Sequence, residues 1–130
     1  MTEAAIEIDG ARKLRKAFKD IDADTSDFTK LHRRLANDVA GTAKTKVPVR
    51  SGRLQRSIRG GATKTSARVM AGNNRKGGPS SVPYAAPIHF GWASRGIRPQ
   101  PFLYEALDDR RQDVVDRYND EVRAMIRRAF

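Results

Sequence analysis

The clearest hydrophobic pattern lies in the first half of the chain and has the spacing of a helix. Its apolar positions recur every three or four residues: Phe28, Leu31, Leu35, Val39, Ala43 and Val47. This spacing places them on one face of an α-helix, and the charged residues between them fall on the other face. Thr25 or Ser26 is the predicted N-cap of this helix. Pro48 ends it, because the residue before a proline disfavours the helical conformation.

A shorter helical pattern precedes this helix. Its apolar stripe consists of Leu14, Ala17, Phe18 and Ile21. Asp9 is the predicted cap. Residues 1–8 show no such pattern, so we expect them to form a loose terminus.

Beyond Pro48 the pattern becomes strand-like. Residues 54–59 and 65–72 are short segments with alternating features, and Gly60-Gly61 stands between them. Two such segments around a glycine pair predict an antiparallel hairpin. The following residues, 72–83, are rich in glycine, asparagine, serine and proline, which predicts a long mobile loop.

The densest apolar segment, Tyr84–Trp92, admits two interpretations. Pro87 excludes a central strand, because a proline cannot donate a hydrogen bond to a neighbouring strand. An edge strand and a short helical turn both remain open. A second loop follows over residues 93–101.

A long amphipathic helix is predicted at the C-terminal end. It begins at Pro101 or Phe102, with acids in its early turns and arginines in its last turns, as the helix dipole favours. Its apolar stripe comprises Leu103, Leu107, Val114, Tyr118, Val122, Met125 or Ile126, and Ala129. If unbroken to Arg128, this helix is about 40 Å long, whereas a compact domain of this size has a radius of gyration of about 14 Å. Its stripe therefore packs either on its own core or, in part, on a neighbouring subunit.

Together these elements predict one α+β domain over residues 1–130. It would contain N-terminal helices, a small antiparallel sheet and a long C-terminal helix. No apolar run approaches the roughly 18 residues that a membrane span needs. We therefore expect a soluble protein that does not enter a membrane.

Charge is distributed unevenly along the chain. It has 26 Lys and Arg against 15 Asp and Glu, a formal net charge of +11. No acid lies between Val39 and Tyr104, a stretch that holds 12 bases. Such a block is typical of a surface that faces nucleic acid or an acidic protein, and a merely solvated basic face is the alternative. The bases assigned to a DNA- or partner-facing surface are Arg50, Arg53, Arg56, Arg59, Lys64, Arg68, Arg75 and Lys76.

Catalytic and metal-binding patterns are missing from the sequence. There is no cysteine, which excludes disulfides, thiolate ligands and a cysteine nucleophile. Neither His32 nor His89 has further ligands at the spacing that zinc needs. No phosphate-binding loop, dinucleotide fingerprint or serine-nucleophile elbow is present. We therefore predict a protein that is not an enzyme and uses no metal or cofactor.

Two segments carry a resemblance to a known family. Residues 47–58 read V-P-V-R-S-G-R-L-Q-R-S-I, residues 84–91 read Y-A-A-P-I-H-F-G, and residues 99–103 follow with P-Q-P-F-L. In order, spacing and length, these segments resemble the gene-product-ten-like minor tail family of tailed-bacteriophage neck and tail-completion proteins, to which the lambda Z protein is distantly similar. The resemblance covers roughly residues 28–125. The matching positions are Pro48, Ser51, Gly52, Leu54, Ile58, Tyr84, Ala85, Ile88, Phe90, Gly91, Pro101, Phe102 and Leu103.

The resemblance implies a structural subunit of the virion, located at the head–tail joint and present in the host cytoplasm during assembly. Such proteins lie between the head-closure ring and the tail terminator. The expected partners are those two proteins and further copies of the chain in a sixfold ring, and the DNA that passes through the neck is a further candidate. Among the motif residues, those expected to be buried together and to fix the last helix are Leu54, Ile58, Ile88, Phe90, Phe102 and Leu103.

Two other functions stay open. A free nucleic-acid-binding module would also use the basic middle segment. However, Phe90 and Trp92 lie in an apolar run rather than among bases, and no basic recognition helix is present. The tail terminator itself belongs to the same structural class, and only the motif match favours the neck.

Overall fold

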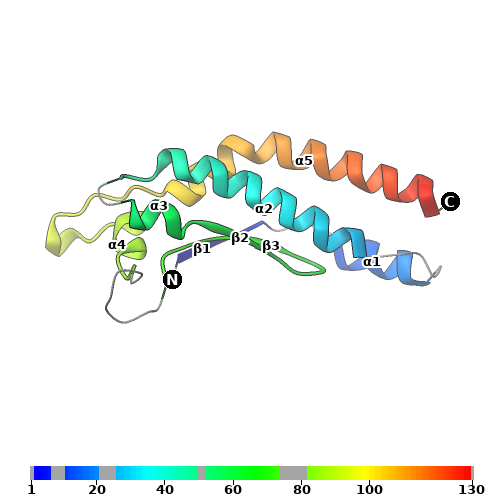
Figure 1. Ribbon diagram of the computed structural model, residues 1–130, viewed down its shortest axis with the longest axis horizontal. Helices are drawn as coiled ribbons and strands as arrows, with labels where there is room; N and C mark the ends of the chain where they lie inside the picture. The colour runs from blue at the N-terminus through cyan, green and yellow to red at the C-terminus, as the bar shows by residue number, and fades with distance from the viewer. Residues whose placement is uncertain (1, 7–10, 21–25, 50–51, 74–81, 130) are drawn as a thin grey trace.

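The computed structural model describes residues 2–6, 11–20, 26–49, 52–73 and 82–129, and it confirms the predicted α+β class. In chain order its elements are β1 (Thr2–Ile6), α1 (Ala11–Asp20), α2 (Ser26–Lys46), α3 (Arg53–Ser57), β2 (Arg59–Ala62), β3 (Ala67–Ala71), α4 (Ala85–Phe90), the 3-10 turn η1 (Ala93–Arg95) and α5 (Phe102–Ala129). The antiparallel sheet has the order β1-β3-β2. Helix α2 packs on β2 and β3, while α5 lies beside α2 and contacts β1 (Figure 1). Helices α3 and α4 gather at one end of this elongated arrangement, and the C-terminus lies at the other end.

Helix α2 supplies the largest part of the core. All six residues of its predicted stripe are buried: Phe28, Leu31, Leu35, Val39, Ala43 and Val47. Val47 follows the end of the helix, and its amide still donates to the carbonyl oxygen of Ala43 at 3.1 Å. Burial of apolar surface is the main favourable term in folding. The stripe of α2 is therefore the surface on which the sheet and α5 are assembled.

Gly60 brings strand β2 into direct contact with α2. A Cβ atom at this position would lie 2.6 Å from Asn37 Oδ1 and 2.9 Å from the carbonyl carbon of Ala36. Both distances are shorter than real Cβ contacts, so only a residue without a side chain allows this approach. The glycine therefore fixes how closely the sheet lies beneath the helix.

The observed hairpin turn lies further along the chain than the predicted one. The antiparallel hairpin is confirmed, but its turn lies at residues 63–66 and not at Gly60-Gly61, which form part of β2. The prediction of residues 54–59 as a strand is wrong, because most of them form α3. Leu54 and Ile58 are four residues apart and both are buried. The turn of α3 places these two residues on the same side, where both reach the main core.

The N-terminal residues correct a second prediction. Residues 2–6 form strand β1 instead of a loose terminus, and residues 7 and 8 lie outside the described residues. Strand β1 pairs with the free edge of β3, and its buried Ala4 lies opposite Val69. An edge strand presents unpaired backbone groups that a further strand satisfies. Because this pairing is long-range, it leaves no periodic signal in the first residues of the chain.

The sheet has one covered face and one open face. Ala67, Val69 and Ala71 are buried on the helix side, as their alternation along β3 requires. Arg68 lies on the open side and pairs there with Glu3 of β1 at 3.7 Å. The sheet thus shields the core from one side only.

The second half of the chain settles the interpretations that were left open. Residues 85–90 form α4, so the short helical turn is right and the edge strand is wrong. Helix α5 begins directly after Pro101 and has 28 residues. Its stripe packs on the chain's own core, with Met125 buried and Ile126 exposed. No helix in the described ranges is both long and apolar enough to cross a membrane.

The predicted first helix is present as α1. Its Leu14 packs against a small cluster formed by Phe28 and Met125. The predicted cap Asp9 and the stripe residue Ile21 lie outside the described residues. Helix α1 therefore extends the core toward the start of α2 and the end of α5.

The predicted mobile loop at 72–83 falls largely on residues 74–81, which lie outside the described residues. Its two ends are tied together. The Asn73 amide donates to the carbonyl oxygen of Val82, and the Val82 amide donates to Asn73 Oδ1, both at 3.2 Å. These bonds hold the start of α4 beside the end of β3.

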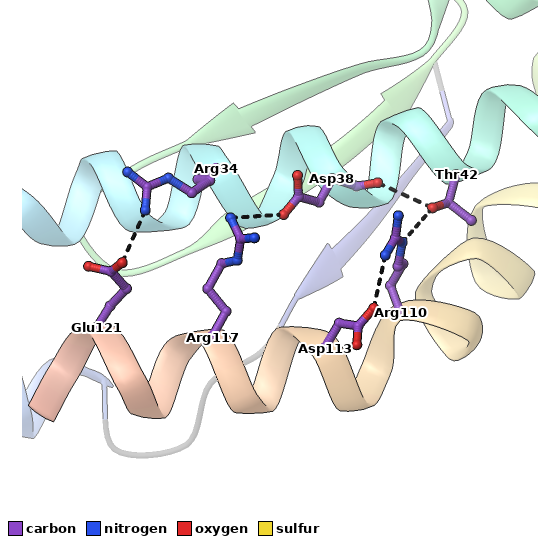
Figure 2. A network of polar contacts seen from close by, with 7 residues as sticks. All are labelled: Arg34, Asp38, Thr42, Arg110, Asp113, Arg117 and Glu121. Atoms are coloured by element: carbon purple, nitrogen blue, oxygen red, sulfur yellow. Dashed lines mark hydrogen bonds and ion pairs between the residues drawn. The ribbon is translucent and has the colours of Figure 1, made fainter.

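A row of polar contacts connects α2 to α5 along their outer side (Figure 2). It is formed by Arg34, Asp38, Thr42, Arg110, Asp113, Arg117 and Glu121. Arg34 pairs with Glu121 at 3.1 Å, and Arg110 Nε donates to Thr42 Oγ1 at 2.7 Å. Exposed ion pairs contribute at most about 1 kcal/mol each. The row therefore aligns the two helices, and the buried stripe supplies most of the stability.

Replacing Gly60 with alanine should lower the free energy of unfolding by about 1–3 kcal/mol, because the added methyl group pushes β2 away from α2. Gly41→Ala is the matched control. No heavy atom lies within 4 Å of a Cβ built at Gly41, so this change should raise stability by up to about 1 kcal/mol. Urea unfolding of the three proteins measures both effects. If both substitutions change stability in the same direction, the close contact at Gly60 is not what positions the sheet.

Candidate interaction site

The first motif segment turns the chain from α2 into α3. After Pro48, Gly52 has a left-handed backbone with a φ of +80°, a conformation that is strained for a residue with a side chain. A Cβ atom there would also lie 2.7 Å from Arg56 Nη1. The Arg56 amide donates to the Gly52 carbonyl oxygen at 2.9 Å and so forms the first turn of α3. Arg50 and Ser51 of the same segment lie outside the described residues.

Ser57 and Arg59 fasten this segment to the end of the sheet. Ser57 Oγ accepts a hydrogen bond from the Gly72 amide at 2.8 Å and donates to the Leu54 carbonyl oxygen at 2.6 Å. Arg59 Nη1 donates to the carbonyl oxygens of Ser57 and Gly72 at 2.8 and 3.0 Å. A Cβ atom at Gly72 would lie 2.8 Å from Cβ of Ala85 in α4. Helix α3, the end of β3 and α4 therefore meet at Gly72.

The second motif segment forms α4 and a loop that returns across it. Gly91 follows α4 with a φ of +82°, and a Cβ atom there would lie 2.9 Å from the ring of Pro99. The Gln100 amide donates to the Ile88 carbonyl oxygen at 2.9 Å. The loop is thereby held against α4 until the chain enters α5 at Phe102.

The returning loop exposes an aromatic side chain. Trp92 and Ile97 form an isolated antiparallel bridge. The guanidinium carbon of Arg95 lies 5.0 Å from the centre of the Trp92 ring, within cation–π range. Trp92 is nearly half exposed, so this stacked pair forms part of the surface.

The two motif segments enclose a single groove of about 610 Å³. Its lining consists of Pro48, Gly52, Leu54, Tyr84, Pro87, Ile88, Gly96, Ile97, Arg98 and Gln100. Every one of these residues belongs to residues 47–58 or to residues 84–103. The lining is mainly apolar, and Arg98 is the one charged residue in it. Two segments far apart in the sequence therefore meet at a hollow that suits apolar side chains of a partner.

Most apolar motif residues are placed as expected. Leu54, Ile58, Phe102 and Leu103 are buried in the main core. Ile88 is partly buried and packs against that core while it lines the groove. These residues hold the start of α5 next to α3 and α4.

Phe90 does not follow this prediction. It is 53% exposed, whereas the neighbouring His89 is fully buried. Ala85 and His89 share the inner side of α4 because four residues make about one helical turn. Reading the segment as alternating would have buried Phe90 with Ile88 instead. The His89 ring packs 5.1 Å from the Phe102 ring, centre to centre, and its nitrogens have no hydrogen-bond partner among the described residues.

The bases assigned from the sequence are exposed wherever they are described, but they do not form one face. Arg53 and Arg56 lie on α3. Arg59 and Arg68 lie on the open side of the sheet, and Lys64 lies in the hairpin turn. The basic segment is thus divided among three parts of the surface.

The remaining assigned bases, Arg50, Arg75 and Lys76, lie outside the described residues. Neither motif segment contains an acid. The charge that the two segments bring to the groove is therefore positive.

Several groove residues were not assigned from the sequence: Pro87, Gly96, Ile97, Arg98 and Gln100. They lie within or between the motif segments, and this position in the sequence is the signal that could have pointed to them. The loop after Gly91 has to return to α4, because α5 begins beside that helix. Only the folded arrangement shows that this return builds one wall of the groove.

Within the described ranges, no group of three or more His, Asp or Glu side chains could hold a metal ion. Comparisons with protein-family models, with curated protein sequences and with solved structures gave no match. The function is therefore inferred from the motif and from the geometry of the groove.

We expect His89 to make stability depend on pH. Burial lowers the pKa of His89 below its ordinary value of 6.5, and this effect exceeds the opposing effect of Glu105. As pH falls through about 6.5 the unfolded chain takes up a proton at this residue, while the folded chain does so only at lower pH. The free energy of unfolding therefore decreases as pH drops from about 6.5 toward the folded-state pKa.

Urea unfolding of the wild type and of His89→Leu between about pH 8 and about pH 5.5 tests this expectation. The leucine variant should lose the part of the decrease that comes from His89. Identical pH profiles for the two proteins would show that His89 is not its source.

Proposed function

We propose that this chain is a non-enzymatic structural subunit of a tailed-bacteriophage particle. In this proposal it forms part of a ring at the head–tail joint, between the head-closure and tail-terminator proteins. The observation that carries the proposal is the groove. Both motif segments that resemble the gene-product-ten-like family line it, and the start of α5 lies beside it. Among the motif residues, Pro48, Gly52, Leu54, Tyr84 and Ile88 line this hollow.

The chemistry of the groove suits a protein partner. Its lining is apolar, and the exposed Arg98 adds positive charge. Arg53 and Arg56 on the nearby α3 add more. A segment of a neighbouring ring protein that offers apolar side chains together with carboxylates matches this surface. A ring subunit needs no catalytic group, only surfaces that repeat from copy to copy.

A free nucleic-acid-binding module is supported less well. Such a module concentrates its bases along the path of the phosphate backbone. Here Arg56, Arg68 and Lys64 lie on three separate parts of the surface. Arg68 is also paired with Glu3. DNA contact therefore stays secondary to protein contact in the proposal.

Purified particles should contain the chain at a small fixed copy number per portal, about six for a sixfold ring. Quantitative mass spectrometry with isotope-labelled peptides, normalised to the portal protein, measures this number. Absence from washed particles would reject the structural role. A DNA affinity that falls steeply and linearly with salt on a log–log plot would then favour the nucleic-acid-binding module.

Arg98→Glu should reduce incorporation into particles by about tenfold or more, because a carboxylate replaces the cation that faces an acidic partner segment. Arg33→Glu is the matched control: it makes the same chemical change at an exposed residue of α2 that does not line the groove. Copies per portal are compared for the two variants. Equal incorporation of both would show that the groove is not the docking surface.

A further inference from the structure

Helix α4 has two buried side chains, and the larger of them is a histidine. Ala85 and His89 are the buried residues of this helix, while Pro87 and Ile88 line the groove. Ala85 offers only a methyl group to the core. The attachment of α4, and with it one wall of the groove, therefore depends to a large extent on the burial of His89.

His89 lies in an aromatic enclosure. Its ring centre is 4.4 Å from that of Phe90, 5.1 Å from that of Phe102 and 4.5 Å from that of Tyr104, each in an edge-to-face arrangement. Neither ring nitrogen has a hydrogen-bond partner among the described residues. This enclosure accepts a neutral imidazole, but it offers an imidazolium no group to pair with at hydrogen-bonding distance.

One carboxylate acts on this site from α5. Burial lowers the pKa of His89 below 6.5, and the charge of Glu105 raises it by a smaller amount. Glu105 is exposed, so water screens its charge. The net effect is that the packed form of α4 resists protonation of His89.

The charged side chains of the other elements beside α4 are engaged elsewhere. Strand β1 contacts α4, but its Glu3 forms an ion pair on the open side of the sheet. In the returning loop, Arg95 stacks on Trp92, and Arg98 lines the groove. Glu105 is thus the charged group that matters for His89 in the described part of the chain.

We propose that His89 is a pH-sensitive latch for the groove. When the histidine is neutral, α4 stays packed on α5 and the groove has both walls. When it takes up a proton, the cation leaves its aromatic enclosure, and α4 moves away together with the loop that follows it. Helix α2, the sheet and α5 stay folded, because α4 contributes only Ala85 to the fully buried part of their common core.

The latch is a property of the free chain and does not require the proposed ring. Its consequence for docking does rest on the proposed function, since a partner seated in the groove would be released as the pH falls. The experiments use the chain alone. Failure of the latch and failure of the structural role are therefore separate results.

Three backbone amides report on α4 and its loop. Ile88 donates to the Tyr84 carbonyl oxygen at 3.2 Å, Gly91 donates to that of Pro87 at 2.8 Å, and Gln100 donates to that of Ile88 at 2.9 Å. Hydrogen exchange followed by NMR measures the protection factor of each amide, corrected for the intrinsic pH dependence of exchange. A local opening should leave these amides at least about tenfold less protected than those of Leu35 and Val39 in α2.

The opening should also depend on pH and only slightly on urea. The open form has an ordinary histidine pKa, so it gains on the closed form as pH falls through 6.5. Between about pH 7.5 and about pH 5.5 the three protection factors should fall by up to about tenfold. Low urea concentrations should change them little, because little surface is exposed, whereas the α2 amides should follow global unfolding.

Two variants separate His89 from other causes. His89→Leu keeps an apolar side chain in the enclosure and should abolish the fall between the two pH values. Glu105→Gln is the matched control, which removes the neighbouring carboxylate and should retain the fall. The His89 ring resonances of the unmodified chain provide a measurement that needs no variant, and they should titrate below pH 6.5.

Three results would overturn the latch. The first is that the α4 and α2 amides show the same protection and the same urea dependence, so that the chain opens only as a whole. The second is a fall in protection that persists in His89→Leu or disappears in Glu105→Gln. The third is a His89 ring that titrates at or above its ordinary pKa.

Discussion

Helix α2 and strand β2 approach until backbone atoms meet at Gly60, and the rest of the fold is arranged around this contact. It sets the height of the sheet beneath α2, so that Val69 of β3 and Ala4 of β1 reach the same core. The side of α2 that the sheet leaves open receives α5, which the polar row of Figure 2 holds in line. Because α5 starts beside α4, this packing also places the second motif segment against the first. The position of α2 on the sheet therefore determines where the groove forms.

The sequence predicts the long helices well and the short elements poorly, for a physical reason. Helices α2 and α5 each bury a stripe over several turns, so their own residues repeat the period of the structure. Strand β1 and helix α4 are short and are defined by partners distant in the chain. The alanines of β1 become a strand because β3 offers an unpaired edge. Gly60-Gly61 has the composition of a turn, yet it lies inside β2. The strand approaches α2 so closely at Gly60 that a side chain there would collide with the helix.

The candidate site shows the same division. The motif correctly indicated the burial of Leu54, Ile58 and Phe102. It did not indicate the phase of α4, and so Phe90 was expected to be buried although it is exposed, and the buried residue is His89. The continuous block of bases in the sequence suggested one cationic face, but the chain forms α3 and the β2–β3 hairpin within that block and distributes the bases among them. What the two motif segments share in the folded chain is an apolar hollow with positive charge, and this combination is typical of a surface that recognises protein.

We expect the groove end of this chain to contact another protein at the head–tail joint. Electron cryomicroscopy of the joint, at a resolution that shows side chains, tests this expectation. It should show a ring of copies of this chain, with density from an adjacent protein between α3 and the loop that follows α4. A joint whose density is explained entirely by other proteins would contradict the proposed function. So would a ring in which this groove faces solvent on every copy.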